Sequence, residues 1–507
     1  MVDSLSAELK IASPRHLPSP QSEALKLIPE DMARKYVALP LEVAGNTLRV
    51  AMADPADIFA LEALGTHTRM RIEPEMAEVT EIQEAIDLNY QAYDAIEKQI
   101  FSISLTSEKA ERRIKVDSTT DTPIAQALTM IIDEAVKARA SDIHLEPQEN
   151  DLRVRYRIDG SLHSLLSLPK QTATPLITRI KVLANMNIAD HHRPQDGQFS
   201  IKAKGRLIDI RVGSIATVHG EMATLRLLDK SRVSLTLSEL GFLPESLAGY
   251  ERMLKAPYGM ILVSGPTGAG KTTSLYASIN CLDSTGRNII TIEDPVEYRF
   301  RDINQIQVNP RAGITFSSGL RAILRLDPDV ILVGEIRDNE TARIAIQSAL
   351  TGHLVLSSIH ANDAVGAAFR LIDLGVEPFL VSSALVGVVA QRMVRQVCPE
   401  CACEIGVPLP EQMAYLQETG EERSRFFYGG GCNNCSNTGY RGRTGIFEIL
   451  NVSDGIRMML LNGANAAQLR EQALKDGMVS LMRDGMLKVK NNITTPYEVL
   501  RNAYSVD

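Results

Sequence analysis

The sequence predicts an α/β protein whose largest domain holds a mostly parallel sheet between two layers of helices. Two observations predict this fold class. From about residue 240 onwards, short apolar strands alternate with helical segments, as in βαβ units. One of these strands leads directly into a glycine-rich loop that opens a helix. We expect the strands at residues 259–264, 288–292, 329–333 and 354–359, inside a core domain of residues 239–397.

The amino-terminal segment predicts a small α/β domain of its own. The chain has 507 residues, which leaves room for about three or four domains. Residues 47–52 alternate like a strand, and residues 79–93 carry Ile82, Ile86 and Leu88 near helical spacing. We place this domain at residues 1–96, followed by a polar linker at 97–120.

A basic middle domain follows at residues 121–232. Residues 151–232 hold 14 bases and 7 acids, although the whole chain is acidic. We expect helices at 123–138 and 174–187, and strands at 141–147, 152–160, 207–214 and 222–228. The strand at 152–160 presents arginines 153, 155 and 157 on one face, since they alternate with apolar residues. Residues 234–241 are expected to form a hinge.

Composition excludes some classes of protein. The chain has 62 acids and 54 bases, a formal net charge of −8, which opposes bulk nucleic-acid binding. The first residues lack the basic and apolar regions of a signal peptide. No apolar run approaches the ~18–20 residues of a membrane span, and the run at 378–390 is short enough for a core helix. We therefore expect a cytoplasmic protein that reaches a membrane through partners.

The glycine-rich loop carries the strongest functional signal. It matches G-x-x-x-x-G-K-[ST] between a strand and a helix, the context of a phosphate-binding P-loop. Backbone N–H groups and the helix N-terminus favour phosphate, Lys271 reaches the β- and γ-phosphates, and Thr272 offers a hydroxyl to Mg²⁺. No guanine-specific Asn-Lys-x-Asp motif is present, so ATP is the expected nucleotide. The predicted nucleotide-binding residues are Gly265, Pro266, Thr267, Gly268, Ala269, Gly270, Lys271, Thr272 and Thr273.

Polar residues end three other predicted strands of the same sheet. Glu293 and Asp294 end one strand, Glu335 follows the second, and His360 ends the third. Because ligands of parallel sheets bind beyond the carboxyl ends of the strands, these side chains are expected to converge on the P-loop. A carboxylate there can hold Mg²⁺ or orient the attacking water. His353 is a further candidate for phosphate contact, with a hydrogen-bonded structural histidine as the alternative.

Cysteine spacing predicts a metal site in a module at residues 398–440. Two C-x₂-C pairs, separated by 30 residues, suit a closed tetrahedral zinc site with a structural role. The expected ligands are Cys398, Cys401, Cys432 and Cys435, and Cys403 is left over. An iron–sulfur centre or reduced thiols without metal remain alternatives. Residues 441–507 are expected to form a helical C-terminal region.

The P-loop, the Thr291–Tyr298 segment, the strand ending at Glu335 and the Gly352–Asn362 segment together resemble the ATPases of bacterial type II secretion and type IV pilus assembly (the GspE/PilB group). Residues 140–147, 157–160 and 193–198 resemble the middle domain of that family. The resemblance extends from about residue 120 to the end of the chain. It implies a RecA-like ATPase domain and a PAS-like α+β middle domain.

Roles for individual residues also follow from this resemblance. Glu335 would be the catalytic carboxylate, Glu293 would support Mg²⁺ and water, and His360 would contact water or the γ-phosphate. Arg211 and Arg226 of the middle domain would approach the γ-phosphate, with a solvated arginine-bearing strand face as the alternative. Further candidates for the arginine role are Arg321, Arg325 and Arg337.

The resemblance further implies a homohexameric ring that uses ATP, Mg²⁺ and Zn²⁺. Its expected partners are an inner-membrane platform protein and a membrane-anchored docking protein that meets residues 1–96, which would place it at the inner membrane as a peripheral protein. Segments such as 350–353 and 371–380 resemble the secretion branch more than the pilus branch. The first 25 residues lack the Arg-Leu-Gly repeat of relatives that bind cyclic di-GMP.

Other functions remain open at this point. A type IV pilus extension ATPase is the nearest alternative, and a retraction motor would lack both the amino-terminal domain and the cysteines. A nucleic-acid motor would have DNA-stimulated turnover. In a non-hydrolysing scaffold, which would use ATP only for assembly, the substitution Glu335→Gln would cause no loss of turnover.

Overall fold

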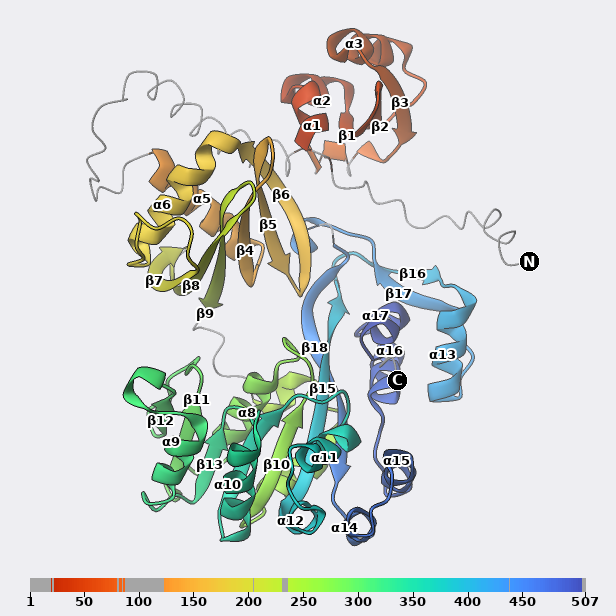
Figure 1. Ribbon diagram of the computed structural model, residues 1–507. Helices are drawn as coiled ribbons and strands as arrows, with labels where there is room; N and C mark the ends of the chain where they lie inside the picture. Colours follow the sequence, from red (N-terminus) through yellow and green to blue (C-terminus); the bar gives the residue numbers. More distant parts are fainter. Residues whose placement is uncertain are drawn as a thin grey trace. The chain divides into compact units, whose positions relative to one another are not determined.

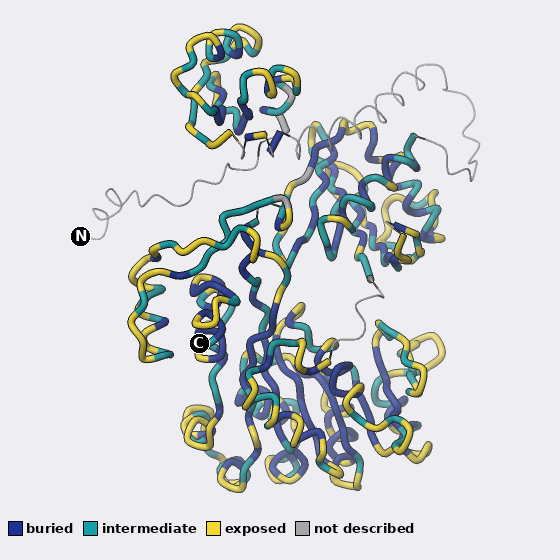
Figure 2. The backbone as a smooth tube through the Cα atoms, turned by 180° about the vertical axis from the view of Figure 1, so that it is seen from behind, coloured by how far each residue is buried: buried dark blue, intermediate teal, exposed yellow. Residues whose placement is uncertain are grey.

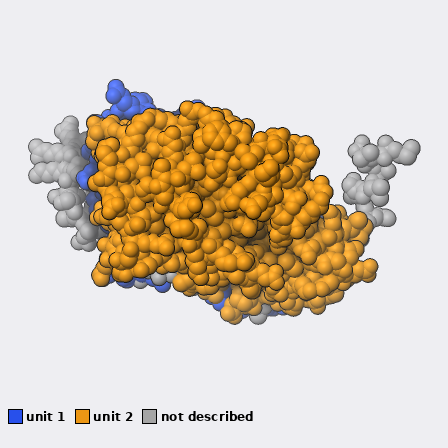
Figure 3. Space-filling view, turned by 90° about the horizontal axis from the view of Figure 1, so that it is seen from below, with its two compact units in different colours: residues 1–230, 430–439 blue, residues 231–429, 440–507 orange. Residues whose placement is uncertain are grey.

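The computed structural model describes residues 20, 22–79, 82–83, 85–86, 123–203, 205–229, 236–436 and 438–503. The chain divides into two compact units, which Figure 3 distinguishes by colour. One contains Met1–Lys230 and Gly430–Gly439, and the other contains Ser231–Gly429 and Tyr440–Asp507. The predicted linker at 97–120 and the first part of the predicted hinge lie outside the described residues. Among the described helices, none is long and apolar enough to cross a membrane.

The amino-terminal part of the first unit is the predicted small α/β domain (Figure 1). In its three-stranded sheet, β1 pairs with β2 in antiparallel fashion and β2 pairs with β3 in parallel. Ile82 and Ile86 of the predicted helix are buried in the domain core, whereas Leu88 lies outside the described residues. The elements are α1 Ser22–Leu27, α2 Glu30–Tyr36, β1 Ala38–Ala44, β2 Thr47–Met52, α3 Ile58–Thr68 and β3 Arg71–Met76.

The middle part of the first unit is an α+β domain with a six-stranded antiparallel sheet. Its strand order is β6-β5-β4-β9-β8-β7. In β5 the even-numbered residues are buried, and the three arginines of that strand point to the other face, as predicted. The elements are α5 Pro123–Lys137, β4 Asp142–Pro147, β5 Asp151–Ile158, β6 Ser161–Pro169, η1 Lys170–Thr172, α6 Ala173–Leu183, β7 Gln195–Ala203, β8 Arg206–Thr217 and β9 Gly220–Asp229.

The helix predicted at 174–187 is shorter than expected. It ends at Leu183, because Asn185 adopts a left-handed conformation with φ 54° that no α-helix continues. Asparagine tolerates this conformation better than most residues, and this preference was the available signal. The chain then turns toward β7.

The second unit contains the predicted mostly parallel sheet. Its seven strands follow the order β12-β11-β13-β14-β10-β15-β18, and all neighbours are parallel except β15 and β18. Alternate residues of β10 point into two cores: Met260 and Leu262 into one, Ile261 and Val263 into the other. Helices α9 to α12 cover the first face, and α7 and α8 cover the second, which makes three layers. Figure 2 shows the central strands as buried.

All four predicted strands of this sheet are present, within one residue of their expected bounds. They are β10 Gly259–Ser264, β11 Ile289–Glu293, β13 Val330–Val333 and β14 Leu354–Ile359. The remaining elements up to the cysteines are η3 Leu237–Leu240, α7 Pro244–Leu254, α8 Lys271–Asn280, β12 Asn304–Gln307, η4 Pro310–Ala312, α9 Phe316–Ile323, α10 Asn339–Leu350, α11 Ala364–Asp373, α12 Pro378–Ala384 and β15 Leu385–Val397.

Two expectations about this unit are wrong. The apolar run at 378–390 is not one core helix, since α12 ends at Ala384 and β15 begins at Leu385. A strand buried on both faces carries the same continuous apolar run as a buried helix. The region after residue 440 is not helical throughout, because β18 pairs with β15 and joins the sheet. The elements from the cysteines onward are β16 Ala402–Gly406, α13 Leu409–Thr419, β17 Arg425–Gly429, η5 Asn433–Cys435, β18 Tyr440–Asn451, α14 Asp454–Leu461, α15 Ala466–Lys475, α16 Leu481–Lys490 and α17 Pro496–Ala503.

Candidate active site

The P-loop connects a fully buried strand to the N-terminus of α8, as the motif predicts. A side chain at Gly265 has no room, since a Cβ there would lie 2.5 Å from the carbonyl oxygen of Gln391. Gly270 directly precedes α8 with φ 87°, a conformation that glycine adopts without strain. The backbone N–H groups at the start of α8 have no helical acceptor of their own, so they suit phosphate oxygens.

The side chain of Lys271 folds back over the P-loop. Its Nζ donates to the carbonyl oxygens of Gly265, at 2.8 Å, and Pro266, at 3.1 Å. Burial lowers the pKa of the Lys271 ammonium, and the negative charge of Glu335 opposes that shift. Thr272 follows in the first turn of α8, where its hydroxyl could meet Mg²⁺.

A buried glutamine, which the sequence analysis did not select, braces the loop. Gln391 of β15 donates from Nε2 to the carbonyl oxygen of Ala269 at 2.6 Å. Its Oε1 accepts a hydrogen bond from Ser274 Oγ at 2.7 Å. Gln391 lies more than 100 residues from both partners along the chain, so no local motif could assign it this position.

Glu335 and His360 meet at the carboxyl ends of neighbouring strands. Glu335 follows β13 after one residue, and His360 directly follows β14. Glu335 Oε2 lies 3.6 Å from His360 Nε2, and Arg337 Nη2 contacts Glu335 Oε1 at 2.5 Å. Ser358 Oγ donates to the carbonyl oxygen of Gly334 at 2.7 Å, which ties the two loops together. The expected convergence of these two side chains is therefore present.

Glu293 occupies a different setting, the centre of a buried hydrogen-bond network. Its Oε1 accepts hydrogen bonds from Thr291 Oγ1 at 2.5 Å and Gln305 Nε2 at 3.2 Å, and its Oε2 accepts from the hydroxyl of Tyr276. Burial and the contact with Glu293 raise the pKa of Tyr276. Neither Tyr276 nor Gln305 belongs to a local motif that would indicate this role. The expected role of Glu293 toward Mg²⁺ stays a prediction.

The two arginines predicted to approach the γ-phosphate are directly opposite each other on adjacent strands. Arg211 of β8 pairs in register with Arg226 of β9, on the face of the sheet away from its core. Arg226 Nε donates to Asp142 Oδ1 at 2.9 Å, and Arg157 Nε lies 3.8 Å from Asp142 Oδ2. The middle domain therefore presents a row of arginines, while the role of Arg211 and Arg226 toward nucleotide stays a prediction.

The remaining candidates divide clearly. Arg337 belongs to the Glu335 cluster, whereas Arg321 forms an exposed ion pair with Glu340 at 2.6 Å. The phosphate contact considered for His353 is wrong, because it precedes β14 and lies at the opposite edge of the sheet from His360. Its Nδ1 is 2.9 Å from the carbonyl oxygen of Ser348, so it is a structural histidine.

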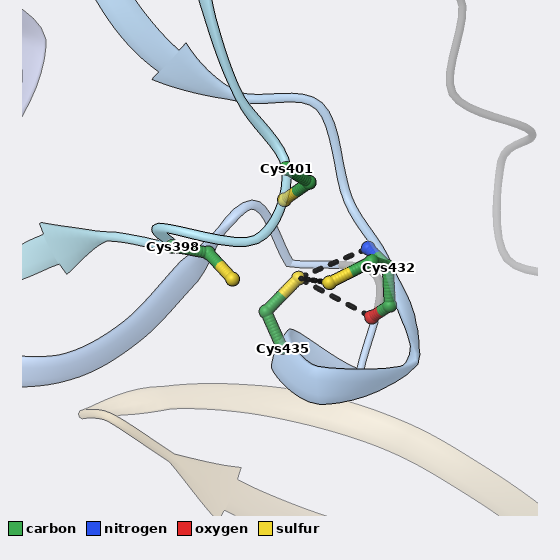
Figure 4. Close-up of side chains that lie close together, drawn as sticks. All are labelled: Cys398, Cys401, Cys432 and Cys435. Carbon is green, nitrogen blue, oxygen red and sulfur yellow. Dashed lines mark hydrogen bonds between the residues drawn. The ribbon is translucent and has the colours of Figure 1, made fainter.

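The four predicted metal ligands form one cluster (Figure 4). The sulfur atoms of Cys398, Cys401, Cys432 and Cys435 all lie within 4.8 Å of one another. Zn–S bonds of about 2.3 Å in a tetrahedron require sulfur atoms about 3.8 Å apart, and Cys432 and Cys435 are 3.7 Å apart. None of the cysteines is in a disulfide. Four thiolates fit zinc, and the exposed Cys403 lies outside the cluster.

Comparison with known proteins gives extensive matches to sequence families. The profile of the family described as Type II/IV secretion system protein matches residues 117–501, and that of the MshEN domain matches residues 9–95. The chain is 40% identical over 500 residues to the Type IV pilus assembly ATPase PilB of Myxococcus xanthus, covering 95% of this chain and 87% of that protein. It is 41% identical over 493 residues to the Type II secretion system protein E of Klebsiella pneumoniae, covering 95% and 98% respectively.

Solved structures agree on the fold. The X-ray structure of the Legionella pneumophila ATPase DotB matches with a TM-score of 0.55 and 20% sequence identity, covering 73% of this chain and 94% of that chain. At that identity the likeness concerns the fold alone, and it agrees with the α/β fold that the sequence predicts.

Proposed function

Since the chain belongs to the type II/IV secretion system protein family and is an ATPase, we propose that its hydrolysis of ATP powers pseudopilus assembly for type II protein secretion. The observation that carries the hydrolytic part of the proposal is the contact of Glu335 with His360, 3.6 Å apart, at the carboxyl ends of β13 and β14. Because ligands of parallel sheets bind beyond the carboxyl ends of the strands, this carboxylate and imidazole would face the terminal phosphate held by the P-loop.

Each of these side chains has a task in hydrolysis. The P-loop N–H groups and Lys271 bind the triphosphate, and Glu335 orients the attacking water and accepts its proton. His360 and Arg337 hold the Glu335 carboxylate in place through its two oxygens. Thr272 would hold Mg²⁺ with the phosphates, and when bound the ion neutralises charge on the phosphate oxygens. Glu293, which its hydrogen bonds hold at the end of β11, would support Mg²⁺ and water.

We propose that the working form is a homohexamer in which Arg211 and Arg226 approach the γ-phosphate. Their in-register pairing on the face of the sheet away from its core supports this, because arginines can stabilise the negative charge of a transferring phosphoryl group. Movement of the middle domain relative to the ATPase domain, about a hinge at residues 234–241, would then transmit the work. Zn²⁺ bound by the four clustered cysteines would be structural.

The expected partners are an inner-membrane platform protein and a membrane-anchored protein that docks on residues 1–96. The chain would work in the cytoplasm, at the inner membrane, with no nucleic acid involved. A type IV pilus extension ATPase is the second candidate. The chain is 40% identical to a pilus assembly ATPase and 41% identical to a secretion protein E, so sequence identity does not favour one function over the other.

Measurement of secretion and piliation tests the proposal directly. A strain producing only Lys271→Ala should fail to secrete folded substrates and should keep its surface pili, if it has them. Loss of pili with intact secretion would favour the pilus alternative. Purified chain should also hydrolyse ATP faster when cytoplasmic domains of the platform and docking proteins are added. Stimulation by DNA instead would contradict the proposal and support a nucleic-acid motor.

A further inference from the structure

The turn that follows His360 is held by three charged side chains from outside it. Residues 360–363 join β14 to α11. Arg392 Nη2 of β15 donates to the carbonyl oxygen of Asn362 at 3.1 Å. Glu448 of β18 accepts a hydrogen bond from the backbone N–H of Ala364 at 2.9 Å. The third side chain, Arg470 of α15, comes from the C-terminal helical region.

Asp363, which lies between Asn362 and Ala364, makes three contacts of its own. Its Oδ1 accepts from the backbone N–H of Gly366 at 2.7 Å, which caps the N-terminus of α11. Its Oδ2 contacts Arg470 Nη2 at 2.6 Å. Its carbonyl oxygen accepts from Ser264 Oγ at 3.4 Å, and Ser264 directly precedes the P-loop. One residue therefore links α15, α11 and the base of the P-loop.

Arg470 also neutralises two carboxylates that would otherwise repel each other. Its Nη1 lies 3.8 Å from Oε2 of Glu448, which is almost fully buried, while its Nη2 contacts Asp363. The planar guanidinium spans both acids at once, which the single ammonium of a lysine does less well. Without this cation the two acids would separate, and the turn between them would move.

We propose that Arg470 is a positioning residue for ATP hydrolysis, because through Asp363 and Glu448 it fixes the turn that presents His360 to Glu335. Displacement of a catalytic group by about 1 Å can cost about 10²-fold in rate. The C-terminal helix α15 thereby controls turnover, although it contributes no side chain to the described contacts of the P-loop. This role rests on the ATPase activity and is independent of what the hydrolysis powers.

Steady-state ATPase kinetics of the full-length chain test this role. Arg470→Ala should lower kcat by about 10- to 100-fold and change KM for ATP by less than about threefold. The matched control is Lys475→Ala on the same helix, which removes an exposed ion pair with Glu471 and should leave kcat unchanged. Arg470→Lys should restore part of kcat, and free guanidinium ion should rescue Arg470→Ala but not Glu335→Gln.

Two further measurements separate positioning from mere stabilisation. Asp363→Asn keeps the helix cap but loses the ion pair, so the double variant Asp363→Asn/Arg470→Ala should be no slower than Arg470→Ala alone. If Arg470→Ala is unfolded at the assay temperature, the kcat values of Arg470→Lys and Asp363→Asn test the proposal in its place. A kcat equal to that of the wild type in both variants would overturn it. Equal kcat in folded Arg470→Ala and Lys475→Ala would also overturn it.

Discussion

His360 Nε2 lies 3.6 Å from Oε2 of Glu335, and the two residues follow adjacent parallel strands. Neither side chain needs an unusual backbone to reach the other, because β13 and β14 end at the same edge of the sheet. The carboxylate of Glu335, the predicted catalytic group, is thus placed by sheet topology and contacted by His360 and Arg337. Four predictions follow from this geometry and from the contacts around it.

Glu335→Gln should abolish turnover and preserve nucleotide binding. The amide cannot accept a proton from the attacking water, so kcat should fall by about 10²- to 10⁴-fold. Binding of a fluorescent ATP analogue should stay within about threefold of wild type, because the P-loop contacts are unchanged. Glu340→Gln is the control, since it removes a carboxylate from an exposed ion pair on α10. Undiminished turnover of Glu335→Gln would refute the assignment of Glu335 as the catalytic carboxylate.

Gln391→Ala should weaken ATP binding more than it slows chemistry. The substitution leaves the carbonyl of Ala269 and the hydroxyl of Ser274 without the partners shown here, at about 1–3 kcal/mol for each buried group. The loosened P-loop should raise KM for ATP by about tenfold, measured by steady-state kinetics. Gln347→Ala, at an exposed position of α10, should behave as wild type. A wild-type KM for Gln391→Ala would show that the P-loop keeps its conformation without the hydrogen bonds of Gln391.

Removal of the clustered thiols should remove one metal ion per chain. Elemental analysis of the purified protein should find about one zinc, and Cys432→Ser should reduce this sharply and lower the thermal unfolding midpoint. Cys403→Ser is the control, because that thiol is exposed and outside the cluster. Iron with visible absorption would indicate an iron–sulfur centre instead. An unchanged thermal unfolding midpoint in protein that contains no metal would show that the four thiols do not need a metal ion to stabilise the fold.

Replacement of Glu448 should change how stability depends on pH. Burial raises the pKa of the Glu448 carboxyl, and the N–H of Ala364 and the charge of Arg470 oppose that shift only in part. A raised pKa means that this group favours the folded state below its unfolded pKa, and the contribution is lost as pH rises through the folded pKa. Glu448→Gln stays neutral, so its unfolding free energy relative to wild type should increase as pH rises above the ordinary pKa of a glutamic acid.

Denaturant titrations at several pH values measure that difference. Glu471→Gln is the matched control, because Glu471 is exposed on α15 and its replacement should give a nearly constant difference over the same range. A difference for Glu448→Gln that does not grow with pH would contradict the assigned direction of the pKa shift.

The sequence predicts the parts of the site that are contiguous in the chain. The strand, loop and helix around Lys271 follow from local spacing, and so do the strand ends that carry Glu335 and His360. The cysteine pairs are also local motifs, and their joint cluster follows from the ligand count of zinc. These features depend on backbone geometry within a few residues, which a sequence records directly.

What the sequence does not reveal are contacts across the fold. No local motif distinguishes Gln391, Tyr276 or Arg470 from other residues of helices and strands. The role of each depends on hydrogen bonds to residues that are distant in the sequence. The strand β15 was missed for a related reason. Its valines continue the apolar run of α12, and only the sheet decides where one element ends and the next begins.

The pairing of β15 with β18 has a consequence for how this chain can be cut or extended. The segment of residues 398–439 connects the end of β15 to the start of β18, its antiparallel neighbour, so it is equivalent to a long insertion in the loop of a β-hairpin. Its length and its thiols could change over evolution without disturbing strand order. A fragment stopped at residue 397, in contrast, would expose thirteen residues of unprotected strand edge to aggregation.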